Sequence, residues 1–114
     1  MPKKPLSPVA VLALSSLAES SRHGYAIMKD VAARSGGAVA PGATSLYRTL
    51  WQLLDEGLVR ETSERPVAPL DDERRRYFQI SPAGRRALAA EIANLERLLS
   101  AARVHRSAVG RARS

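Results

Sequence analysis

The sequence contains no cysteine, which excludes disulfides, thiol nucleophiles and thiolate metal sites. Its two histidines, His23 and His105, stand far apart, so we expect no metal site and no cofactor. No apolar run approaches the roughly 20 residues that span a bilayer. No cleavage site typical of a signal peptide follows the short apolar stretch 9–14. We therefore predict a chain without a membrane segment or signal peptide, and the missing cysteines are consistent with a cytoplasmic location.

Acidic residues are few relative to basic ones. The 114 residues include 11 Asp and Glu against 18 Lys and Arg, which gives a formal net charge of +7. A chain of this length forms one domain by the usual size range. Its excess of positive charge favours a polyanionic partner, nucleic acid first and an anionic membrane second.

Signals of an enzyme are also missing. The sequence shows no nucleophile paired with a base and no glycine motif that cradles phosphate. Gly36-Gly37 and Pro41-Gly42 are typical of helix ends and starts rather than of a nucleotide site. We expect no catalytic residue and no enzymatic activity.

Three short helices are predicted in the first half of the chain. Ser7-Pro8 begins the first, which runs to about Glu19 and is apolar on nearly all sides, so it must be covered by a partner subunit or by a late helix. The second begins at residues 23–25 and ends at Gly36-Gly37. The third follows Pro41-Gly42, ends at Gly57 and places four leucines on one face: Leu46, Leu50, Leu53 and Leu54.

The second half begins with a predicted β-hairpin formed by residues 58–62 and 76–80, with a long charged tip. Ser81-Pro82 then begins a long helix that runs to about Arg103 or a little beyond. The predicted fold is mostly α with a small β-hairpin: a winged helix-turn-helix over residues 1–80, a C-terminal dimerisation helix over 81–106 and a flexible basic tail over 107–114.

The outward face of the third helix is the first candidate site, because an α-helix fits the major groove of duplex DNA. Arg48 can bond a guanine edge or a phosphate, and Gln52 can read adenine. Thr44, Ser45 and Tyr47 can bond phosphates or base edges. The alternative is a solvated helix face with no partner.

Trp51 lies on the same outward face as Thr44, Arg48, Gln52 and Asp55. We favour partial burial of its ring against the hairpin or a neighbouring subunit. A contact with DNA or stacking on a ligand is the functional alternative.

Further phosphate contacts are predicted at three places. At the hairpin tip, at least one of Arg74, Arg75 and Arg76 should point away from the sheet, although Asp71, Asp72 and Glu73 can neutralise them. Lys3 and Lys4 form a basic arm. The helix N-terminus at His23 and Tyr25 can hold an anion, although capping or packing is the more common role of such a histidine.

The last helix carries an apolar seam with heptad spacing: Leu88, Ile92, Leu95, Leu99 and Ala102. Packing onto its own domain is one interpretation. We favour a homodimer in which this seam is joined by Val11 and Leu14 of the first helix, since a protein that reads two half-sites must be a dimer.

Taken in order, several motifs resemble the PadR family of transcriptional regulators. They are His23-Gly24-Tyr25 with Met28-Lys29, residues 45–50 (SLYRTL), residues 53–59 (LLDEGLV), residues 72–78 (DERRRYF) and Ser81-Pro82-Ala83-Gly84. The resemblance implies a winged helix-turn-helix that binds double-stranded operator DNA as a dimer and usually represses transcription. Some members release DNA on binding phenolic acids or drugs, which implies a small aromatic effector. This chain is similar to members with a single C-terminal helix, and Trp51 stands where the family often carries a basic residue.

We thus expect a sequence-specific DNA-binding repressor. The alternative is a winged helix that binds another protein and has no specific DNA site, an interpretation favoured by the acidic residues 71–73.

Overall fold

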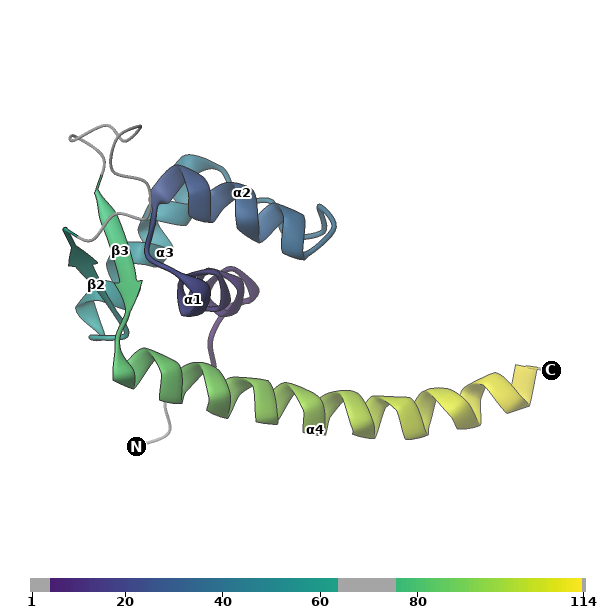
Figure 1. Cartoon of the computed structure of the whole chain (residues 1–114). Coiled ribbons are helices and arrows are strands. Elements are labelled where there is room, and N and C mark those ends of the chain that lie inside the picture. Colours follow the sequence, from purple (N-terminus) through teal and green to yellow (C-terminus); the bar gives the residue numbers. More distant parts are fainter. Residues whose placement is uncertain (1–4, 64–75, 114) are drawn as a thin grey trace.

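The computed structural model describes residues 5–63 and 76–113, with side chains up to Arg103. The chain folds into helices and short strands in an order that places three helices before the hairpin and one after it (Figure 1). The elements are α1 (Pro8–Glu19), β1 (Arg22–His23), α2 (Gly24–Arg34), α3 (Ala43–Asp55), β2 (Val59–Thr62), β3 (Tyr77–Ile80) and α4 (Pro82–Arg113). The predicted fold class, mostly helical with a small hairpin, is confirmed.

The first helix is the centre of the core. Ser7 caps it by accepting a hydrogen bond from the Ala10 amide at 3.1 Å, and Pro8 occupies its first position. One side of α1 packs against α2 and α3, and another packs against α4 (Figure 1). The late helix therefore supplies the second cover that an all-round apolar helix requires within a single chain.

The sheet has three antiparallel strands in the order β1-β3-β2. The hairpin strands pair with Val59 opposite Ile80 and Thr62 opposite Tyr77. The two-residue strand β1 was not predicted, because Arg22-His23 carries no strand pattern of its own and pairs through its backbone with Phe78 and Tyr77.

The hydroxyl of Ser81 joins the first turn of α4 to the chain that leaves α3. It donates a 2.6 Å hydrogen bond to the carbonyl oxygen of Gly57 and accepts one from the Gly84 amide at 3.0 Å. The Ser81 amide in turn donates to the Leu58 carbonyl at 3.0 Å. A Cβ on Gly84 would fall on that same Leu58 carbonyl oxygen, so the helix and the chain leaving α3 meet backbone to backbone.

The last helix is longer than expected. It continues to Arg113 without interruption, so the interval 107–114, predicted as a flexible tail, is helical up to that residue. The backbone of Gly110 remains helical although glycine lowers helix propensity. Among the described residues, no helix is both long and apolar enough to span a membrane.

Two residues assigned to the dimer interface belong instead to the core of the chain. Leu14 is 0% exposed and Leu88 is 8% exposed, and both pack in the same hydrophobic cluster. The reason is that α4 folds back along α1 over its first turns. These two side chains are therefore not available to a second subunit in the way the sequence suggested.

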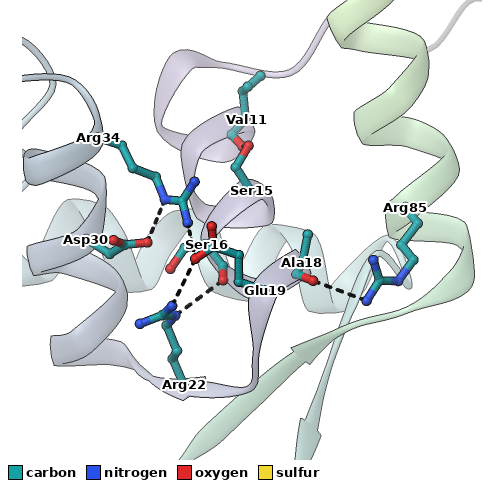
Figure 2. A network of polar contacts seen from close by, with 9 residues as sticks. All are labelled: Val11, Ser15, Ser16, Ala18, Glu19, Arg22, Asp30, Arg34 and Arg85. Carbon is teal, nitrogen blue, oxygen red and sulfur yellow. Dashed lines mark hydrogen bonds and ion pairs between the residues drawn. The ribbon is translucent and has the colours of Figure 1, made fainter.

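A network of charges joins α1 to α2 (Figure 2). Arg34 bonds the carboxylate of Asp30 at 2.6 Å and that of Glu19 at 2.6 Å, and Arg22 reaches Glu19 at 3.3 Å. Burial by itself raises the pKa of the Asp30 carboxyl. The hydrogen bond from Arg34 and the charges of Arg34 and Arg22 outweigh burial and lower that pKa below its ordinary value.

Asp30→Asn is expected to lower the free energy of unfolding at pH 7 by roughly 0.5–1 kcal/mol, because Arg34 loses a partly buried ionic partner. A carboxyl whose pKa is depressed by folding stabilises the protein above its unfolded pKa of about 3.9. That contribution is lost as the pH falls through the lower folded value, so wild type and variant should converge below about pH 4. Urea unfolding followed by the fluorescence of Trp51 measures both effects.

The exposed carboxylate of Asp55 supplies the control, because Asp55→Asn removes the same charge away from the network. Equal stability losses in the two variants at pH 7 would contradict a specific role for Asp30.

Candidate nucleic-acid interface

The outer face of α3 forms an open groove of about 660 Å³. Gly42 precedes the helix without a side-chain cap, and Thr44 and Ser45 of the first turn are exposed. Leu46, Leu50 and Leu53 are buried on the opposite face, so burial fixes which side of the helix meets solvent. Six residues line the groove: Thr44, Tyr47, Arg48, Trp51, Gln52 and Asp55. Of the predicted DNA-contacting residues of this helix, Ser45 alone is not part of the lining.

Tyr47 is held against the start of α2. A Cβ placed on Gly24 would overlap the Tyr47 hydroxyl and the adjoining ring carbon, so the ring lies directly on the glycine backbone. Gly24 itself is buried and opens α2. The role of this glycine in setting the approach of α2 and α3 was not seen in the sequence, where it was assigned only to a helix start.

Trp51 is 44% exposed and is held by neighbours from its own helix and from the hairpin. Its ring centroid lies 6.4 Å from that of Phe78 in an edge-on contact and 6.2 Å from that of Tyr47. Arg76 immediately precedes β3, and its guanidinium lies over the indole, 5.5 Å from the centroid of the ring. The favoured interpretation, partial burial against the hairpin, agrees with these contacts.

His23 caps α2, as its most common role predicts. Its Nδ1 accepts a hydrogen bond from the Ala26 amide at 3.2 Å, which requires a ring without a proton at that atom. The ring also packs edge-on against Tyr77. Tyr25 is exposed beside it, with the Lys29 ammonium 5.5 Å from the centre of the Tyr25 ring.

Arg76 is exposed at the base of the wing, 3.4 Å from the carboxylate of Glu61 on β2. The four other basic residues predicted to contact phosphates, Lys3, Lys4, Arg74 and Arg75, lie outside the described residues. The described part of the candidate interface therefore consists of α3, the start of α2 and the inner end of the hairpin.

Beyond its first turns, α4 presents an apolar surface to solvent. Ile92, Leu95 and Leu99 are 41%, 43% and 50% exposed, and Ala102 is exposed as well. Leu98, at 59% exposed, widens this surface and was missed because it lies outside the heptad positions. Val11 of α1 is half-buried against the core.

Comparison with known proteins gives one family. The model described as the transcriptional regulator PadR-like family matches residues 13–90. An uncharacterized 37.1 kDa protein in transposon TN4556 of Streptomyces fradiae is 39% identical over 100 residues, which cover 87% of this chain. The chain spans about a quarter of that relative, 26% of its length.

Solved structures share the fold. A transcriptional regulator from Clostridium thermocellum superposes with a TM-score of 0.71 at 22% identity, over 83% of this chain and 86% of the other. A PadR-family regulator from Clostridium difficile gives 0.68 at 18% identity, over 83% and 94%. RosR of H. salinarum gives 0.60 at 26% identity, over 85% and 77%.

Gly24→Ala is expected to lower the free energy of unfolding by about 1–3 kcal/mol, because the new methyl group must displace Tyr47 from a packed position. Alanine is the better helix former, so loss of stability here would point to the contact and not to helix propensity. Urea unfolding measures the change.

A double-mutant cycle with Tyr47→Ala supplies the control. In that background the ring is gone, and Gly24→Ala should be neutral or stabilising. The same loss in both backgrounds would show that the Gly24–Tyr47 contact is not the cause.

Proposed function

The chain belongs to the PadR-like family of transcriptional regulators, whose members bind DNA, and on this premise we propose that it is a homodimeric repressor that reads an operator with α3. The family is one of regulators and not of enzymes. The outer face of α3 carries the proposal. This face presents exposed polar side chains, whereas the opposite face of the same helix is buried in the core.

The roles on α3 follow from position and chemistry. Arg48 lies one turn after Thr44 on the exposed face and reaches a guanine edge or a phosphate. Gln52, one turn further, pairs with adenine through its amide. Thr44 and Ser45, next to the free amides of the helix N-terminus, bond backbone phosphates.

Phosphate contacts flank the reading helix. Tyr25 and Lys29 of α2 and Arg76 of the wing are all exposed. The predicted contacts of Lys3, Lys4, Arg74 and Arg75 stay part of this proposal. Each phosphate neutralised releases counterions and adds about −0.9 to the slope of log affinity against log salt.

The homodimer forms through the exposed part of α4. Four apolar side chains between Ile92 and Leu99 lie open to solvent on one helix, and 32 residues give a helix of about 48 Å, long enough to pair well beyond the domain. Val11 and Ala102 border this surface. Two copies joined there present two α3 helices to successive half-sites, about one turn of DNA apart.

Release by a small aromatic effector completes the proposal. An apolar space between two α4 helices suits a flat, apolar ligand, and ligand pockets in proteins are largely apolar with few polar groups. A regulator of this kind works where the chromosome lies, so we place it in the cytoplasm.

Arg48→Ala is expected to weaken binding to the operator by about 5-fold to 150-fold, equivalent to the 1–3 kcal/mol of one good base contact. Fluorescence anisotropy with the chain's own upstream region measures it, beside a scrambled duplex and with excess competitor. Arg86→Ala removes the same charge from an exposed position of α4 and should leave specificity unchanged.

Near-wild-type affinity of Arg48→Ala would contradict the role of that residue. Weak and equal binding of the wild type to both duplexes, repeated with DNA selected from a random library, would instead favour a winged helix that binds another protein.

Leu95→Glu is expected to yield monomers, because a charge in the middle of the apolar face must be desolvated when α4 pairs. Light scattering measures the mass of the particle in solution. Glu96→Ala, at the neighbouring exposed position, should remain dimeric. A dimer that persists in Leu95→Glu would place the interface elsewhere.

A further inference from the structure

Trp51 is an apolar ring at the centre of a polar reading face. Arg48 and Gln52 line the same groove and are exposed, and 44% of the tryptophan is in contact with solvent. Three neighbours hold the ring: Phe78 in an edge-on contact, Tyr47 in a tilted one and the guanidinium of Arg76 over its face. An exposed aromatic held in place by packing is suited to contact a partner at little cost in conformational entropy.

The ring also lies at the level of the base-reading residues. Helical side chains lean toward the N-terminus, so a residue covers the turn that precedes its own Cα. Tyr47 lies one turn before Trp51 and next to Arg48, and the 6.2 Å separation of the two ring centroids shows that the indole lies beside the side chains of that preceding turn. When α3 enters the major groove, the indole therefore faces the base edges beside those read by Arg48.

Duplex DNA offers such a ring a single apolar group in that groove. Base faces are stacked and inaccessible, and the edges of guanine, cytosine and adenine present polar donors and acceptors. Thymine alone adds a C5-methyl group. The indole carries a single donor, the Nε1–H at one rim of the ring, so most of its exposed surface is apolar and matches the methyl group rather than the polar edges.

We propose that Trp51 is a specificity-determining residue that reads the C5-methyl of a thymine in each half-site, with Arg76 as its positioning residue. This inference rests on the proposed function, because it requires α3 to lie in the major groove. It also gives the wing a role in base recognition, since Arg76 and Phe78 belong to the hairpin and hold the ring that reads the base.

Uracil in place of thymine removes that methyl group and nothing else, so it tests the contact on the DNA. The wild-type protein first selects a duplex from a random library. A series of duplexes is then made from it, and in each one uracil replaces a single thymine at the equivalent position of both half-sites. At one position per half-site, the replacement should weaken wild-type binding by about fourfold per methyl group, the value of burying one such group. Fluorescence anisotropy at fixed salt measures the change.

A cycle with Trp51→Gln separates this contact from changes in the DNA itself. The variant should bind thymine and uracil duplexes equally at that position. Gln52→Ala, on the same face, should keep the full sensitivity to uracil. Arg76→Ala should reduce the sensitivity, because the ring loses the cation that covers it.

The outcomes separate the two proposals. If the wild type selects no duplex, the proposed function fails. If it selects and binds one tightly but no uracil replacement weakens binding, the proposed function stands and the role of Trp51 is overturned. Equal sensitivity in Trp51→Gln and wild type overturns it as well. The replacement in the wild type needs no altered protein, so a misfolded variant cannot hide the result.

Discussion

The hydroxyl of Ser81 is the point through which the two halves of the molecule are aligned. It bonds the Gly57 carbonyl just after α3 and the Gly84 amide in the first turn of α4. The backbone of Gly84 lies so close to the Leu58 carbonyl that a side chain would not fit between them. The start of α4 and the chain that leaves α3 therefore meet through backbone contacts and not through long side chains. The direction of α4 relative to α3 is therefore set within one turn of Ser81. In a dimer joined through α4, that direction decides how far apart two reading helices lie.

A second chain of contacts aligns α3 itself. The ring of Tyr47 rests on Gly24 of α2, Trp51 lies beside Tyr47, and Phe78 of β3 meets Trp51 edge-on. The same side chains that line the groove thus connect α2, α3 and the wing. A change that loosens one of them alters the surface offered to DNA as well as the packing beneath it. Sites held this way are precise because neighbouring packing restricts their rotamers.

Much of this arrangement could be predicted from the sequence. Ser7-Pro8 marks the start of α1, the leucine spacing of α3 fixes its buried face, and Ser81-Pro82 begins α4 as expected. These signals are local, so one segment suffices to reveal them. Strand β1 escaped prediction because it exists only through its partner Phe78. Leu14 and Leu88 were misassigned for a similar reason: the periodicity of a helix shows that a face is apolar, but not whether the chain or a second copy covers it.

The apolar seam of α4 has a buried part and an exposed part. The buried part fits packing of the seam onto its own domain, and the exposed part fits pairing with a second copy. Leu88 completes the core against α1, whereas Ile92 and the apolar residues after it remain open. The winged domain therefore closes its own core within one chain, and the proposed pairing through α4 is not needed for that core. In the proposed dimer, folding and dimerisation are separate equilibria, and the fraction of dimer would depend on protein concentration. Since one subunit presents one α3, occupancy of a two-half-site operator would rise more steeply with concentration than binding of either half-site alone. The proposed dimer would therefore make operator occupancy depend on the abundance of the protein itself.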